Sequence, residues 1–133
     1  MTKKERKALR TFQMGELSAV VMYKRLAELV KDEAMKDELL KHAAEEGKHA
    51  GILKNLSGEI VKPRNILKNP VVLGYRFLGR KAIFKIIAKS EKLAAKLYKK
   101  YFDVFPEVIP IAEDELRHGE AMAKLAKTKR QKS

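Results

Sequence analysis

Two of the three histidines in this 133-residue chain follow a glutamate by three positions. The pairs are Glu46 with His49 and Glu115 with His118. Residues three apart lie on one face of a helix, so each pair could bind one metal ion through a carboxylate oxygen and an imidazole nitrogen. A single pair is weak evidence, and solvated helix surface with incidental spacing is its alternative. Two pairs in separate halves of the chain favour a metal site.

Two further glutamates interrupt apolar helical patterns. Glu16 lies between Phe12 and Val20, and Glu91 follows Ile87 by one turn. A charge on a buried stripe costs on the order of several kcal/mol unless it is paired or bound to a metal, so a lysine partner is the alternative to metal ligation. One Glu from each of two helices and Glu-x-x-His from each of two others form the ligand set of a di-metal carboxylate site.

Tyrosines follow both of these glutamates at the same distance. Tyr23 comes seven residues after Glu16, and Tyr98 comes seven after Glu91. Because seven residues are about two helical turns, each tyrosine points the same way as its glutamate. We predict that both phenols donate hydrogen bonds to ligand carboxylates of the opposite half of the chain and thereby assist catalysis. Tyrosines that only fill the core are the alternative.

Other polar residues near these positions are not predicted to bind metal. His42 precedes Glu46 by one turn and is expected to support the ligands or to lie at an interface. The remaining glutamates nearby, Glu45, Glu113 and Glu120, are rotated off the ligand stripe and are expected at the surface.

The elements that must position these residues are helices. Apolar residues recur at a helical rather than an alternating period throughout the chain, and no stretch predicts a strand. The first expected helix runs from about Lys4 to Lys31, and the second follows a polar break at Asp32 to Asp37 and ends at Ser57-Gly58. The third runs from Pro70 to about Phe102, with Asn69 as N-cap and a break near Gly79. The fourth follows a turn at Asp103 to Pro106 and runs from Val108 to Leu125.

These helices predict an all-α fold. The connection from Glu59 to Asn69 is long, and the other links are short. The expected architecture is therefore a ferritin-like four-helix bundle of two antiparallel hairpins joined by a long crossover. We expect one domain over residues 1–133, with short basic tails at both ends.

Composition limits the kinds of metal site that the chain can form and the class of protein to which it can belong. The chain has no cysteine, which excludes disulfides, thiolate zinc sites and cysteine-ligated iron–sulfur centres, so a metal must bind through oxygen and nitrogen. The longest stretches without a charged residue span seven residues, as from Leu17 to Tyr23, too few for a membrane-spanning helix. No signal-peptide pattern follows the basic start, so we expect a cytoplasmic protein.

The charge balance favours anionic partners only weakly. Thirty Lys and Arg against 17 Asp and Glu give a net charge of +13. Such a charge attracts nucleic acid or acidic lipid. A basic and aromatic segment could dock on either partner, but an amphipathic helix start packed on a partner subunit is the favoured interpretation, and a homodimer is expected. The segment comprises Tyr75, Arg76, Phe77, Arg80, Lys81, Phe84 and Lys85.

The motifs resemble those of the rubrerythrin family within the ferritin-like superfamily. Besides the Glu-x-x-His pairs, the runs Gly58 to Pro63 and Ile111 to His118 are similar to the rubrerythrin-like domain found fused to vacuolar-iron-transporter-type membrane domains, here expected to be free-standing. The similarity extends from about Leu9 to Leu125. It implies two iron ions, with manganese or zinc compatible with the same ligands. The ligands it implies are Glu16, Glu46, His49, Glu91, Glu115 and His118.

The resemblance also implies an oxidoreductase that oxidises Fe(II) or reduces peroxide or dioxygen. Two features depart from the family pattern. Ala94 stands where rubrerythrins often carry a further carboxylate, and the chain has no cysteines for a rubredoxin module. Electrons for turnover must therefore come from a separate protein. The alternative is a non-enzymatic iron-binding or iron-delivery module that serves a metal transporter or another partner.

Overall fold

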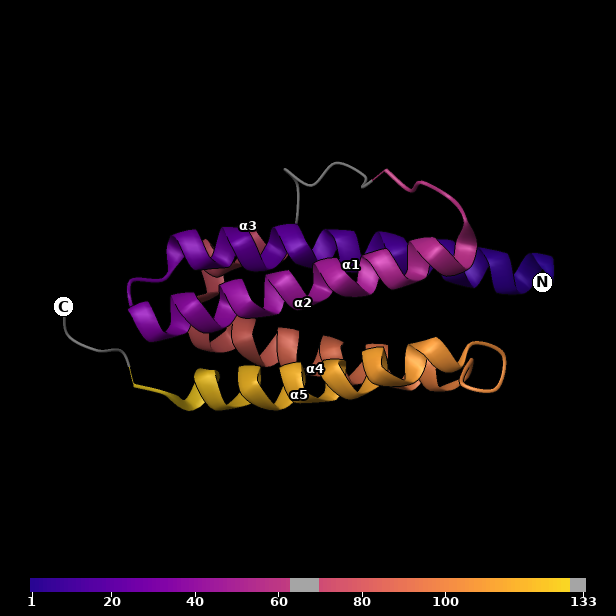
Figure 1. Cartoon of the computed structure of the whole chain (residues 1–133). Helices are drawn as coiled ribbons and strands as arrows, with labels where there is room; N and C mark the ends of the chain where they lie inside the picture. The colour runs from indigo at the N-terminus through magenta and orange to yellow at the C-terminus, as the bar shows by residue number, and fades with distance from the viewer. Residues whose placement is uncertain (63–69, 130–133) are drawn as a thin grey trace. The chain divides into compact units, whose positions relative to one another are not determined.

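The computed structural model describes residues 1–62 and 70–129, without the side chains of Pro70 and Val72. These residues form helices and no strand, which confirms the all-α prediction (Figure 1). They divide into two compact units, before and after the boundary between Asn69 and Pro70. The elements are α1 (Lys3–Leu29), α2 (Glu33–Ser57), α3 (Pro70–Leu78), α4 (Arg80–Lys99), the short 3-10 helix η2 (Pro106–Val108) and α5 (Ile109–Lys127).

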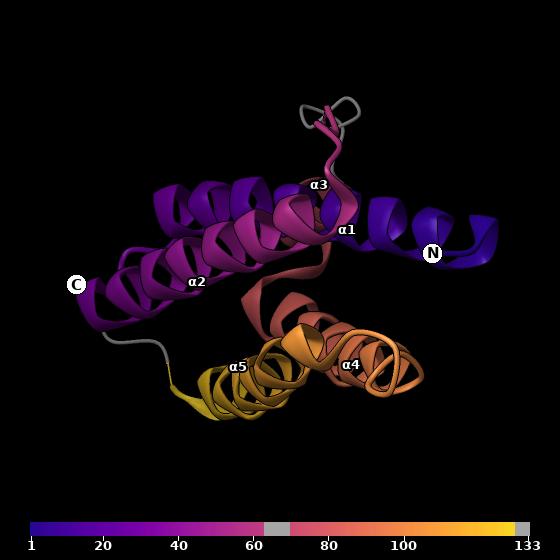
Figure 2. The ribbon, with the colours of Figure 1, turned by 45° about the vertical axis from the view of Figure 1, so that its right-hand side comes forward.

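The first unit is an antiparallel hairpin of α1 and α2, which pack along their lengths (Figures 1 and 2). The link between them is shorter than predicted. The polar break expected from Asp32 to Asp37 is wrong beyond Asp32, because the Asp32 carboxylate accepts a hydrogen bond from the Met35 backbone N–H at 3.0 Å and caps a helix that begins at Glu33. The apolar side chains buried in this unit include Leu9, Leu26, Leu39 and Leu53.

The end of α2 matches the Ser57-Gly58 prediction. Gly58 has a φ of 69°, a left-handed conformation that glycine adopts without steric cost, and its N–H donates to the Lys54 carbonyl at 2.8 Å. The next residue is tied back to α1, because the Gln13 side-chain amide donates to the Glu59 carbonyl at 3.0 Å. Residues 63–69, and with them most of the predicted connection and the predicted cap at Asn69, lie outside the described residues.

The second unit pairs α4 with α5 in antiparallel orientation and begins with the short α3 (Figure 2). The predicted break is confirmed at Gly79, where φ is 85°. The third predicted helix ends at Lys99 rather than Phe102, because turns begin at residue 100. The Arg80 guanidinium donates to the carbonyls of Leu125 (2.7 Å) and Thr128 (2.5 Å), which fastens the start of α4 to the end of α5.

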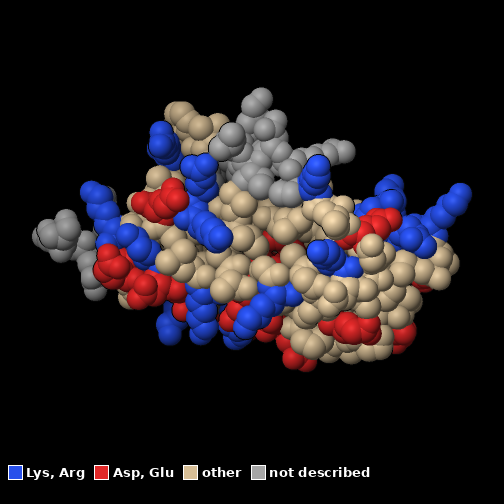
Figure 3. All heavy atoms as spheres, turned by 45° about the horizontal axis from the view of Figure 1, so that its top comes forward, with Lys and Arg blue, Asp and Glu red and all other residues tan. Residues whose placement is uncertain are grey.

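No helix in the described part of the chain combines the length and the apolar composition that crossing a membrane requires. On the face drawn in Figure 3, Lys and Arg side chains are scattered among the other residues, and Asp and Glu side chains lie between them.

Candidate metal centre

The first unit brings three candidate ligands together. Glu16 comes from the middle of α1, and Glu46 and His49 come from α2. The His49 Nδ1 atom lies 3.5 Å from Glu16 Oε2 and 3.1 Å from Glu46 Oε1. All three side chains are buried, with at most 3% of each residue exposed. We call these residues the N-terminal triad.

The second unit builds the same arrangement. Glu91 comes from α4, and Glu115 and His118 come from α5. The His118 Nδ1 atom lies 3.8 Å from Glu91 Oε2 and 3.9 Å from Glu115 Oε1. These residues are also buried, and His118 is fully inaccessible. We call them the C-terminal triad.

The two triads share one plan. In each, the first helix of the pair contributes a single glutamate and the second contributes Glu-x-x-His, and the imidazole presents Nδ1 to both carboxylates. Within either triad the potential ligand atoms lie within 4.8 Å of one another. Two ligands of a tetrahedral ion with bonds of about 2.1 Å are about 3.4 Å apart, close to these separations. Either triad could therefore hold a metal ion.

The electrostatics of each triad favour a divalent cation. Two carboxylates and a neutral imidazole carry a charge of about −2, which one divalent ion cancels. Buried carboxylates without a cation are unfavourable, because removal from water costs several kcal/mol for each ion. A set of carboxylate oxygens and imidazole nitrogens suits iron, manganese and zinc.

A glycine beside the C-terminal triad allows close packing of its helices. A Cβ atom at Gly119 would lie 3.1 Å from the Ala88 carbonyl oxygen and 3.5 Å from the Glu91 Cβ atom. A side chain here would push α5 away from α4 at the level of His118 and Glu91. Sequence reasoning did not identify Gly119, although a glycine inside a helix and next to a predicted ligand was an available signal.

A second glycine, Gly47, lies beside the N-terminal triad, directly after Glu46, whereas the position related to Gly119 in this hairpin is occupied by Ala50. A Cβ atom there would meet only the Val20 side chain, at 4.0 Å, which is ordinary van der Waals contact. An added methyl group therefore fits at Gly47 without displacement, whereas at Gly119 its neighbours must move.

The two tyrosines are buried as expected, with Tyr23 at 0% and Tyr98 at 2% exposure. Tyr23 packs edge-on against the His42 ring, with 5.1 Å between ring centroids. The His42 Nε2 atom lies 3.0 Å from Glu38 Oε1, one turn earlier on α2. His42 is thus paired with Glu38, a partner that sequence reasoning missed although its spacing of four residues is a helical one. Hydrogen bonds from the phenols to ligand carboxylates stay a prediction.

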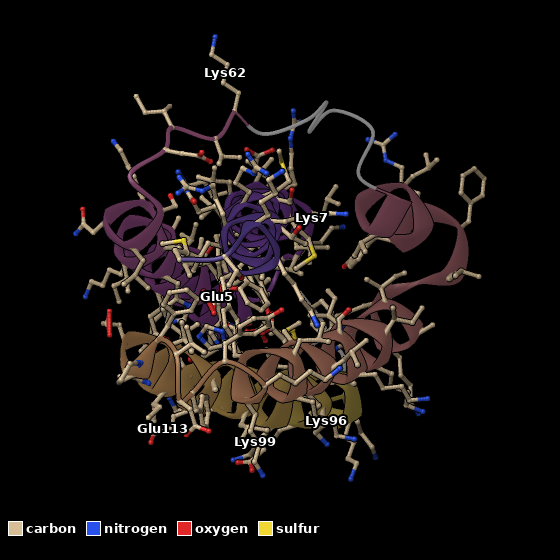
Figure 4. All side chains as sticks on the ribbon, turned by 90° about the vertical axis from the view of Figure 1, so that its right-hand side faces the viewer. Glu5, Lys7, Lys62, Lys96, Lys99 and Glu113 are labelled. Atoms are coloured by element: carbon tan, nitrogen blue, oxygen red, sulfur yellow. The ribbon has the colours of Figure 1, made fainter. Side chains whose placement is uncertain are left out.

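The glutamates predicted to lie off the ligand stripe do not join a triad. Glu113 and Glu120 are exposed, and Glu45 is half-buried. Glu113 points outward from α5 in Figure 4. The face of α5 that carries Glu115 and His118 is therefore distinct from the face that carries Glu113.

Comparison with known proteins adds no relative: no family model matches the chain, and neither a curated protein nor a solved structure matches it.

Proposed function

We propose that the chain is a di-iron carboxylate oxidoreductase that oxidises Fe(II) or reduces peroxide or dioxygen. The ligands of this proposal are Glu16, Glu46, His49, Glu91, Glu115 and His118. The single observation that supports it most is that two hairpins independently assemble the same buried Glu, Glu and His triad. We propose further that the hairpins form a ferritin-like bundle in which both triads serve one dinuclear site.

Charge balance supports pairing of the triads. Four carboxylates carry −4, and two divalent ions carry +4, so the loaded site is near neutral. Without metal the same carboxylates repel one another in surroundings that screen charge poorly. In this proposal two bound ions would relieve that repulsion. Resemblance to the rubrerythrin family is a further proposal that rests on the same residues.

The chain's own residues have separate tasks at such a site. The carboxylates of Glu16 and Glu91, one on each first helix, would bind the ions and neutralise their charge. The imidazoles of His49 and His118 fix the ions from the second helices. Tyr23 and Tyr98 orient the carboxylates by hydrogen bonding in this proposal and exclude water by filling the space around them.

Iron is the proposed metal because it supplies the electrons that side chains cannot. When bound, two Fe(II) ions give one electron each, and with two protons these reduce one hydrogen peroxide to two water molecules. Continued turnover needs a separate electron-donor protein, because the chain has no cysteine to ligate a further iron centre. If Fe(II) is itself the substrate, the ferric product must leave the site instead.

The proposal is tested by anaerobic titration with Fe(II), followed by peroxide. We expect saturation at two iron per chain and then a near-ultraviolet absorption band typical of a coupled ferric pair. An unchanged spectrum would argue against the proposed chemistry.

Repeated peroxide addition with a chemical reductant separates the enzyme from a storage or delivery module. An enzyme consumes many equivalents of peroxide per site. A delivery module consumes one equivalent and then stops, and it passes its iron to a chelator faster than it consumes peroxide.

A further inference from the structure

An exposed apolar cluster lies on α3, far in sequence from any proposed ligand. Leu73 and Leu78 are each 62% exposed, and Phe77 is 81% exposed. Leu73 and Phe77 lie one turn apart on the same side of the helix. On another side Gly74 lies close to Ile83 of α4, where a Cβ atom would come within 3.0 Å of Ile83 Cδ1. Single exposed apolar residues are ordinary, but three within six positions indicate a docking surface.

The same region carries a one-sided charge. From Ile60 to Ser90 the sequence has eight Lys and Arg and no Asp or Glu, so 31 residues supply +8 of the net +13. Among the described residues Arg76, Lys81 and Lys85 are exposed. The Arg80 guanidinium is engaged with the carbonyls of Leu125 and Thr128 and is not part of the proposed docking surface.

We infer that α3 and the first turns of α4 bind an anionic lipid surface. The side chains of Leu73, Phe77 and Leu78 enter the boundary between headgroups and acyl chains, and Arg76, Lys81 and Lys85 contact headgroup phosphates. Large apolar residues beside basic residues on a short helix are typical of helices that lie in the membrane interface without crossing it.

Charge complementarity distinguishes this partner from a second copy of the chain. A symmetric contact through α3 would place the same acid-free segment of both copies together, so like charges would repel. Nucleic acid matches the charge but offers no apolar phase to Leu73 and Leu78, and phosphate contacts need only the basic side chains. An anionic bilayer satisfies both the charge and the apolar cluster.

The test is sedimentation of the full chain with vesicles of phosphatidylcholine, with and without phosphatidylglycerol. We expect binding only to the vesicles that contain phosphatidylglycerol and a decline of binding as salt increases. Lys81→Gln with Lys85→Gln should weaken partitioning by about 30-fold, since each surface lysine contributes about a factor of five near an anionic bilayer. Leu73→Ser with Phe77→Ser should weaken it by at least about tenfold.

Two control variants match these changes on the same helix pair. Lys96→Gln with Lys99→Gln removes the same charge from the other end of α4, where both side chains project away from the helix (Figure 4). Leu93→Ser with Leu97→Ser removes two exposed leucines outside the basic segment. Both controls should bind vesicles almost as well as the unchanged chain, and circular dichroism should show equal helix content in all four variants.

Several results would overturn the inference. One is binding to vesicles of phosphatidylcholine alone that equals binding to vesicles with phosphatidylglycerol. Another is a loss of binding in the control variants as large as the loss in the test variants. A DNA duplex that binds the chain when vesicles do not would assign the surface to nucleic acid. Conversion of a dimer to a monomer by the α3 variant would assign it to a subunit interface.

Discussion

At the scale of single residues, each triad places one imidazole between two carboxylates. His49 Nδ1 lies within 3.5 Å of two carboxylate oxygens, and His118 Nδ1 lies within 3.9 Å of two. A proton on the imidazole would leave a net charge of −1 in each triad, whereas a divalent ion leaves none. A divalent ion would therefore compensate the buried charge more completely than protonation would.

Replacement of one histidine tests this assignment. His49→Gln should lower the metal retained per chain below that of the unchanged protein and weaken affinity by at least about tenfold, because it removes a nitrogen ligand. Retained metal is measured by elemental analysis after dialysis against a weak chelator.

His42→Gln is the matched control. His42 is equally buried and lies on the same helix, but it pairs with Glu38 rather than with the triad. The His42→Gln variant should retain the metal content of the unchanged protein. Equal losses in both variants would show that burial of any imidazole on α2, rather than ligation by His49, determines metal content.

How much of the site the sequence predicts depends on how far apart the interacting residues lie along the chain. Glu46 with His49 and Glu115 with His118 are local pairs that helical spacing alone predicts, and the structure places each pair together with one more glutamate. Gly119 was missed because its role depends on the approach of α4, which is distant in sequence.

At the scale of elements, the packing of α5 against α4 depends on Gly119. Gly119→Ala should weaken metal binding by several-fold while helix content is retained, because the added methyl group moves α5 by a few tenths of an ångström at the triad. Titration of the metal-free protein with Co(II), followed by absorption spectroscopy, measures the effect.

Gly47→Ala provides the comparison on the other hairpin. Its added methyl group meets only a Val20 side chain at ordinary distance, so metal affinity should be unchanged. If both alanine variants bind metal like the unchanged chain, close helix approach at Gly119 has no role in positioning Glu91 and His118.

The helix ends lead to a prediction about stability. Gly58→Ala should lower the free energy of unfolding by about 1 kcal/mol, because alanine is strained at a φ of 69°. Gly51→Ala should raise it by about 0.5–1 kcal/mol, because Gly51 is inside α2 with open space around it. Urea unfolding of the metal-free protein measures the change in the free energy of unfolding for both variants. Changes of the same sign would contradict the assignment of Gly58 as the helix cap.

Element boundaries were predictable where a local signal marks them. Gly58 and Gly79 end helices as glycine predicts, and Pro70 begins one. The polar residues after Asp32 were misleading, because a run of charged residues is compatible with an exposed helix face once Asp32 supplies the cap. Polarity alone therefore does not distinguish a loop from the first turn of a helix.

At the scale of the whole molecule, metal binding should be linked to stability. Each site that binds metal only in the folded state adds about 2.7 kcal/mol at a free metal concentration of 100 times Kd. Loading of both sites should therefore raise Tm by roughly 20 °C. Calorimetry with and without a chelator measures the shift, and a variant with His49→Gln and His118→Gln should show a much smaller one. Equal shifts in both proteins would place the stabilising metal elsewhere.

The pairing of the triads also belongs to this scale, because local sequence patterns predict each hairpin but not its partner. Mössbauer spectroscopy of the oxidised, iron-loaded chain tests that pairing most directly. We expect two ferric ions per chain that are magnetically coupled, with a diamagnetic ground state at low temperature. Two uncoupled high-spin ferric signals would show that the triads bind their ions separately and would contradict the proposed dinuclear site.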